Sequence, residues 1–138
     1  MRLIYLLLFL CAATFADAQI RVMSYNIKFD DTRDSVNNWA NRKQDVVGLM
    51  DYHGADIIGV QEALKHQLDD LVEGLGNFKM LGVGRDDGKE AGEYSALLYN
   101  DEMFDVVESG TFWLSPTPDQ VSTGWDAALP RVCTWALF

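Results

Sequence analysis

Apolar and polar positions follow two different periods along the first half of the chain. Residues 20–27 (IRVMSYNI) alternate with a period of two, as half-buried strands do. From residue 39 to residue 53 the apolar side chains return every three or four positions, which predicts a helix closed by Gly54. An apolar run at residues 56–60 predicts a buried strand, and leucines at helical spacing over residues 64–75 predict a second helix.

The second half of the chain changes to short β segments separated by loops. Loop signals fall at residues 84–93, which are charged and rich in glycine, and at the long polar stretch 115–124. We expect a turn at residues 100–101, and strands at residues 78–83, 94–99, 103–107 and 132–138. Two β–α units followed by successive strands predict an α/β (α+β) architecture of mixed sheets with helices outside them.

The first 18 residues have the pattern of a secretory signal peptide. Arg2 supplies a positive start, residues 3–13 are almost wholly apolar, and Ala-Asp-Ala at residues 16–18 has the form of a signal-peptidase site. We therefore predict a signal peptide at residues 1–18 and an exported domain at residues 19–138, periplasmic or secreted, with no stable membrane anchor. A retained, uncleaved anchor is the alternative.

The charge balance argues against one class of partner. The formal net charge is -10, and loss of residues 1–18 leaves it unchanged because Arg2 and Asp17 cancel. Lysines and arginines are scattered along the chain, with no run longer than two. A protein that grips nucleic acid without regard to sequence needs a cationic surface. Divalent cations and small phosphorylated ligands stay compatible with this composition, and no protein partner is evident.

Asn26 and Glu62 stand at the ends of the first two predicted strands. Open α/β sheets place their sites at the carboxyl ends of strands, and a carboxylate at such an edge must be solvated, paired or bound to a cation. A site with oxygen ligands alone is expected to bind Mg²⁺, Mn²⁺ or Ca²⁺. Each residue taken alone has a plainer interpretation, since Glu62 suits a helix N-terminus and Asn26 suits a turn.

Five segments in order carry a resemblance to a known family. VMSYNIKFDD and DIIGVQEALKHQLDDL are similar to the opening two motifs of the endonuclease/exonuclease/phosphatase superfamily, the group that contains deoxyribonuclease I and exonuclease III. GRDDGKEAGEYSALLYN, ESGTFWLSPTP and GWDAALPRVCTWALF resemble its secreted bacterial branch. The likeness extends from about residue 20 to residue 138.

This resemblance implies a four-layer α/β/β/α sandwich and an exported, divalent-metal-dependent phosphoesterase. Glu62 matches the family's metal-binding glutamate, and Asn26 matches the asparagine near the metal and the scissile phosphate. The cofactor implied is Mg²⁺, or Mn²⁺ or Ca²⁺ in its place. The substrate is a phosphate ester, with nucleic acid, lipid and sugar phosphate all open, and the acidic balance favours a small ester over long duplex DNA.

The chain departs from the family pattern in its later motifs. A T-H-x-D-H-like stretch, a G-D-x-N stretch and a closing Asp-His pair are absent, and His53 and His66 are interpreted as surface residues. We expect the remaining base and metal ligands beyond Phe138, and therefore an incomplete N-terminal half with little or no catalysis. The alternative is a non-catalytic exported binding module, or a remnant, with the same fold.

Several further residues have a functional and a structural interpretation. Arg131 is a candidate substrate contact through a phosphate, although a structural salt bridge is the favoured interpretation. Trp113 and Trp125 suit packing at the rim of a loop more than stacking on a base or sugar. Cys133, the one cysteine after residue 18, is interpreted as a buried structural thiol.

Two motif-like stretches are set aside. Asp30, Asp31 and Asp34 lack the glycine and the terminal glutamate of a calcium-binding EF-hand loop, so a solvated loop is expected there. Gly82-Val83-Gly84 begins like a dinucleotide-binding fingerprint, but Asp87 occupies the third glycine position, which excludes a nucleotide-binding domain of that type.

Overall fold

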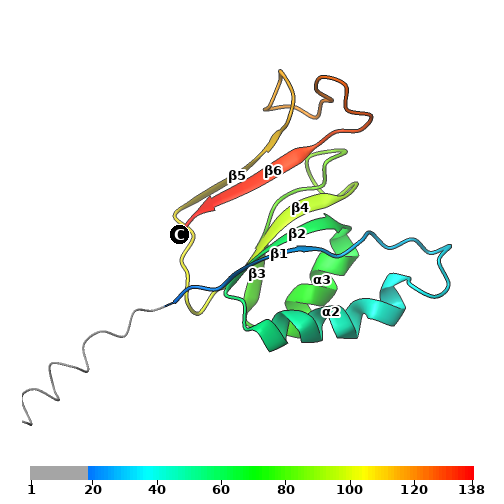
Figure 1. Cartoon of the computed structure of the whole chain (residues 1–138). Coiled ribbons are helices and arrows are strands. Elements are labelled where there is room, and N and C mark those ends of the chain that lie inside the picture. The colour runs from blue at the N-terminus through cyan, green and yellow to red at the C-terminus, as the bar shows by residue number, and fades with distance from the viewer. Residues whose placement is uncertain (1–18) are drawn as a thin grey trace, which may run out of the picture.

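The computed structural model describes residues 19–138 and opens with a parallel β–α–β unit (Figure 1). Strand β1 (Val22–Asn26) leads through helix α2 (Trp39–His53) to strand β2 (Ile57–Ala63). The two strands pair in parallel, with Val22 opposite Ile57 and Asn26 opposite Gln61. This register brings the ends of β1 and β2 to the same edge of the sheet.

Four strands form the larger sheet, in the order β1-β2-β4-β3. Strand β4 (Tyr94–Asn100) pairs antiparallel with both β2 and β3 (Phe78–Leu81), so the sheet is mixed. Helix α3 (Lys65–Leu75) lies beside α2 on one face of this sheet. The core lies between the helices and the sheet, and its fully buried side chains include Ile58, Val60, Leu68, Leu71 and Leu98.

Local signals fix both ends of α2. The side chain of Asn38 accepts a hydrogen bond from the backbone N–H of Asn41, which caps the first turn. Gly54 ends the helix in the left-handed conformation with φ of 57°. The helix predicted over residues 39–53 is confirmed at both ends. Trp39, Val46 and Met50 are its buried residues.

A two-stranded antiparallel sheet packs on the other face of the larger one. Strands β5 (Glu108–Trp113) and β6 (Val132–Leu137) form it, and β6 contacts β4 (Figure 1). The order is helices, larger sheet, smaller sheet, and residues 19–138 place no helix outside the smaller sheet. The predicted α/β (α+β) class with mixed sheets is confirmed, and the described residues provide three layers of the expected four.

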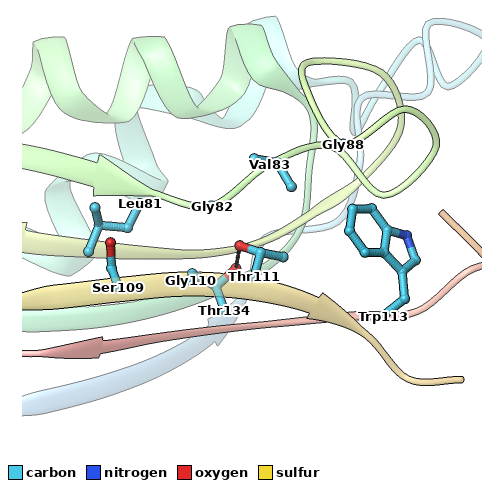
Figure 2. Close-up of a pocket in the computed structure, with 9 residues that line it drawn as sticks. All are labelled: Leu81, Gly82, Val83, Gly88, Ser109, Gly110, Thr111, Trp113 and Thr134. Atoms are coloured by element: carbon cyan, nitrogen blue, oxygen red, sulfur yellow. Dashed lines mark hydrogen bonds between the residues drawn. The ribbon is translucent and has the colours of Figure 1, made fainter. Parts of the chain in front are cut away.

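A cavity of about 290 Å³ lies between the two sheets, near β3. Figure 2 shows that Thr111 and Thr134 face each other across β5 and β6, with their hydroxyl oxygens 3.0 Å apart. Glycine backbone and Trp113 form much of the remaining lining. No acidic, basic, histidine or cysteine side chain lines this cavity.

The structure corrects three predicted strands. The strand expected at 103–107 is wrong, because Asn100 accepts backbone hydrogen bonds from Met103 and Phe104 and turns the chain there, and β5 begins at Glu108. The strand expected at 56–60 continues to Ala63, so Glu62 lies inside it. The strand expected at 78–83 ends at Leu81, before Gly82, whose φ is 126°.

The predicted signal peptide, residues 1–18, lies outside the described residues. Among residues 19–138, neither helix combines the length and apolar character that crossing a membrane requires.

Candidate active site

Asn26 and Glu62 meet at the carboxyl ends of β1 and β2. The Nδ2 of Asn26 donates a hydrogen bond to the Oε1 of Glu62 at 2.8 Å. Within residues 19–138 the second carboxylate oxygen, Oε2, receives no hydrogen bond. The pair is a direct result of the β1–β2 register, which sets Asn26 opposite Gln61.

Glu62 occupies a bulge in β2. Gln61 pairs with Ser95 and Ala63 with Tyr94, so Glu62 has no partner on β4. Its φ is 61°, in the left-handed region that residues other than glycine rarely adopt. Strained backbone of this kind is concentrated at functional sites, where the surrounding structure holds it in place.

The amide of Asn26 is oriented by partners on both sides. Its Oδ1 accepts a hydrogen bond from the backbone N–H of Lys28 at 2.9 Å, while its Nδ2 faces the carboxylate of Glu62. An N–H can only donate and a carboxylate can only accept, so these partners assign the amide orientation. The hydrogen bond from Lys28 to the side chain of Asn26 closes an Asx turn, and Lys28 itself has φ of 59°.

A pocket of about 270 Å³ joins this pair to the second sheet. Arg131, just before β6, lines it together with Asn26 and Glu62. Its side chain is exposed and enters none of the ion pairs formed among residues 19–138. The salt bridge favoured for Arg131 is therefore not formed among residues 19–138, and its guanidinium borders the same pocket as the carboxylate of Glu62.

The pocket wall also contains an ion pair that the sequence did not reveal. Arg85, 9% exposed, donates from Nη1 and Nη2 to the two carboxylate oxygens of Glu93 at 2.9 and 3.0 Å. The indole of Trp113 donates to the carbonyl of Arg85 at 2.9 Å. In sequence both charged residues lie within a stretch that looks like a solvated loop, so no pattern distinguishes them.

The other candidates are spread over the molecule. His53 is exposed at the end of α2, and His66 is exposed with its Nε2 3.1 Å from Asp30, so both are surface residues outside the pocket. Trp113 is buried as expected for a packing residue. The packing interpretation is wrong for Trp125, because this residue is 79% exposed.

One of the two remaining expectations needs correction, because Cys133 is half-buried and not fully buried. The loop that carries Asp31 and Asp34 is largely exposed, as expected for a solvated loop, and these carboxylates pair on its surface with Arg33 and Lys28. Hydrogen bonds from Lys28 and from the backbone of Asn37 hold the pKa of Asp34 well below its ordinary range, with the Asn37 bond the larger cause.

The pocket residues fit part of a divalent-cation site. Within residues 19–138 no three histidine, cysteine or acidic side chains gather closely enough to hold a metal ion. Glu62 nevertheless offers a carboxylate with one oxygen free of hydrogen bonds, beside an amide. Mg²⁺ is often held by one or two carboxylates together with substrate phosphate and water, so this donor set suits it.

Fold and site together define a two-sheet α/β sandwich with a carboxylate–amide pair at the strand ends. No protein-family model matches the chain, and no curated protein matches it. Solved structures do match. An endonuclease/exonuclease/phosphatase from Bacteroides vulgatus is 46% identical with a TM-score of 0.82, over 85% of this chain and 45% of its own. A mannosyl-6-phosphatase from Bacteroides thetaiotaomicron is 47% identical with a TM-score of 0.83, over 86% and 45%. A protein of unknown function from Enterococcus faecalis is 33% identical with a TM-score of 0.76, over 83% and 45%.

These likenesses agree with the resemblance seen in the sequence motifs. The chain belongs to the endonuclease/exonuclease/phosphatase superfamily. It spans about 45% of the length of the relatives it matches, which agrees with the prediction that it represents the N-terminal half of such a domain.

Proposed function

We propose that this chain contributes the Asn26–Glu62 side of the active site of an exported, divalent-metal-dependent phosphoesterase. The observation that carries the proposal is the 2.8 Å hydrogen bond between these residues in a pocket that Arg131 also lines. Glu62 holds the cation, Mg²⁺ or Mn²⁺ or Ca²⁺ in its place. Such a cation polarises a phosphoryl oxygen and offsets the charge that develops during hydrolysis.

The chain's own groups divide the work of holding the substrate. Arg131 carries a permanent charge and a planar set of donors, which suits two oxygens of one phosphate group. Asn26 supplies amide hydrogens directed to the same side of the pocket as the Glu62 carboxylate. No histidine of residues 19–138 lines this pocket, and Glu93, its other carboxylate, is paired with Arg85, so the described residues provide no unpaired general base beside Glu62. By itself this chain is therefore expected to bind phosphate and to hydrolyse little or none.

A small phosphate ester is the substrate class that we favour. One structural relative is a mannosyl-6-phosphatase, and at 47% identity it supports a sugar phosphate more than a long nucleic acid. The net charge of -10 and the scattered basic residues favour the same choice, because a polyanion would be repelled. Phosphomonoesters and small phosphodiesters both fit this proposal, and residues 1–18 support a periplasmic or secreted location.

Calorimetric titration of residues 19–138 with MnCl₂, followed by inorganic phosphate, tests this assignment. We expect phosphate to bind only after Mn²⁺. Glu62→Gln should weaken both events by at least roughly tenfold, while Arg131→Ala should weaken phosphate binding alone. The matched control is Arg33→Ala, since Arg33 pairs with Asp31 outside the pocket. Equal Mn²⁺ affinity of the wild-type and Glu62→Gln proteins would overturn the assignment.

A binding module without catalysis is the second candidate. The absence of a three-ligand acidic or histidine cluster within residues 19–138 favours it. To separate the two, Glu62→Gln is introduced at the native locus and metal-dependent hydrolysis of mannose 6-phosphate is measured in the exported fraction. A catalytic role predicts loss of that activity, and unchanged activity favours the binding module.

A further inference from the structure

Gln67 is a polar side chain buried completely, at 0% exposure, between the two backbone segments that carry Asn26 and Glu62. It lies in the first turn of α3. Its Oε1 accepts hydrogen bonds from the backbone N–H of Leu64 at 3.1 Å and of Asp30 at 3.0 Å. Its Nε2 donates to the carbonyl oxygen of Lys28 at 3.1 Å.

These three bonds connect the two halves of the site. Leu64 lies two residues after Glu62, and Lys28 lies two residues after Asn26. The backbone N–H of Lys28 is the group that fixes the Oδ1 of Asn26, at 2.9 Å. The buried amide of Gln67 therefore holds the carbonyl group of the same residue whose N–H group orients Asn26.

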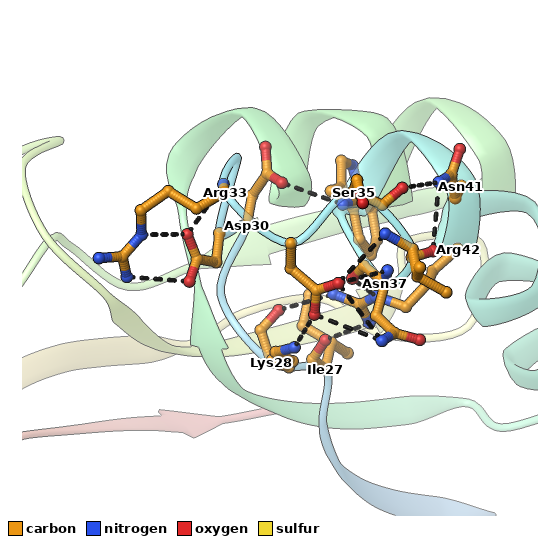
Figure 3. A network of polar contacts seen from close by, with 12 residues as sticks. Ile27, Lys28, Asp30, Arg33, Ser35, Asn37, Asn41 and Arg42 are labelled. Carbon is orange, nitrogen blue, oxygen red and sulfur yellow. Dashed lines mark hydrogen bonds and ion pairs between the residues drawn. The ribbon is translucent and has the colours of Figure 1, made fainter.

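The turn needs such support because its backbone is unfavourable. Lys28 has φ of 59°, in the left-handed region that is unfavourable for a residue other than glycine. Arg42 gives a second hold, with Nη1 donating to the carbonyl of Ile27 at 2.7 Å and Nη2 to that of Lys28 at 3.2 Å. Figure 3 shows Arg42 beside Ile27 and Lys28 at this turn, and the Nζ of Lys28 also donates to the Oδ2 of Asp34 at 2.9 Å.

A plainer role for Gln67 is capping of α3. Its bond to Leu64 is the half of a capping box in which the third helical side chain reaches back to the N-cap backbone. Capping explains the Leu64 contact, but it does not explain the contacts to Asp30 and Lys28, which belong to a segment 37 and 39 residues earlier.

We propose that Gln67 is a positioning residue that sets the Asn26 amide against the Glu62 carboxylate. Its consequence for catalysis rests on the proposed function, whereas the positioning itself does not. A buried donor or acceptor without a partner is costly, so a change at Gln67 displaces the turn at Lys28 before it disturbs the core. Asn26 then loses its fixed orientation while β1 and β2 stay paired.

Side-chain amide resonances of residues 19–138 test the proposal without metal or substrate. The two side-chain amide resonances of Asn26 are assigned as those that disappear in Asn26→Asp. Their rate of exchange with water is then compared between wild type and the variants Gln67→Met, Gln67→Asn and Leu71→Val. Leu71 is the matched control, because it is fully buried on the same helix and makes no polar contact with the turn. In both Gln67 variants we expect the side-chain amide of Asn26 to exchange with water roughly five- to tenfold faster, as for the loss of one hydrogen bond. In Leu71→Val we expect its exchange rate to stay unchanged.

An unchanged Asn26 amide in a folded Gln67 variant would reduce Gln67 to a helix cap and overturn the proposal. Gln67→Asn keeps an amide in the core and is the milder change, and trimethylamine N-oxide is added to both variants if either unfolds in buffer. The result is separable from the proposed function. Faster exchange at Asn26, with no Mn²⁺ binding by the wild-type chain, would keep the positioning role and reject the metal site.

Discussion

Glu62 combines two properties expected of a functional residue, a strained backbone and a carboxylate oxygen that receives no hydrogen bond from residues 19–138. Its φ of 61° lies in the left-handed region, which glycine adopts readily and other residues rarely adopt. We expect Glu62→Gly to be more stable to urea than Glu62→Ala by about 1 kcal/mol, because both remove the side chain and only glycine relieves the strain. Equal midpoints and slopes for the two variants would show that the bulge stores no strain.

Residue type and position along the chain were enough to find some of these groups. Asn26 and Glu62 each follow an apolar strand, and parallel pairing necessarily brings strand ends together. The Arg85–Glu93 pair could not be predicted, because its burial depends on how Trp113 of β5 packs over the loop. That Arg131 forms no ion pair among residues 19–138 likewise depends on where the fold places the acidic residues of this part of the chain.

In the loop between β3 and β4, the backbone at Gly84 lies very close to the backbone at Ala91. A Cβ atom at Gly84 would collide with the carbonyl oxygen of Ala91. Gly84→Ala should therefore destabilise the protein by about 1–3 kcal/mol, and should loosen the Arg85–Glu93 pair that lies in this loop. Thermal unfolding followed by circular dichroism measures the change.

Gly48 supplies the control for that prediction. It lies within α2, and a Cβ atom there would meet nothing within 4 Å. Gly48→Ala should stabilise the protein by about 0.5–1 kcal/mol, since alanine is the better helix former. If both alanine variants changed stability in the same direction, close packing at Gly84 would not be the cause.

Periodic elements were the ones that the sequence predicted well. Both helices end at a glycine, Gly54 or Gly76, and bury apolar side chains at helical spacing, so α2 and α3 match the expectation closely. Strand β5 was missed because ESGTFW has no alternation and contains a glycine, while the more apolar stretch before it forms the turn after Asn100. The bulge at Glu62 is set by pairing with β4, a contact between segments far apart in the chain.

The whole molecule is acidic, and several of its carboxylates are held ionised by the fold. The indole N–H of Trp39 and the ammonium of Lys43 lower the pKa of Asp70 below its ordinary 3.8, and so join α2 to α3. Backbone hydrogen bonds from Ala91 and Lys89 lower the pKa of Asp87 in the same way.

A lowered folded-state pKa means that the unfolded chain binds protons more readily. The stabilisation is therefore complete above pH 3.8 and is lost as the pH falls through the folded-state value. Asp70→Asn should be less stable than wild type at pH 7, with the difference shrinking by pH 3. Urea unfolding at both pH values measures it, and a difference that did not depend on pH would exclude the charge of Asp70 as its source.

Paramagnetic broadening by Mn²⁺ in the amide spectrum of residues 19–138 tests the central claim most directly. The account predicts that the side-chain amide of Asn26 and the backbone amides of Gln61 and Glu62 broaden first, and that Glu62→Gln removes the effect. Broadening centred on the acidic turn at residues 30–34, or unchanged in Glu62→Gln, would contradict a cation site at the ends of β1 and β2.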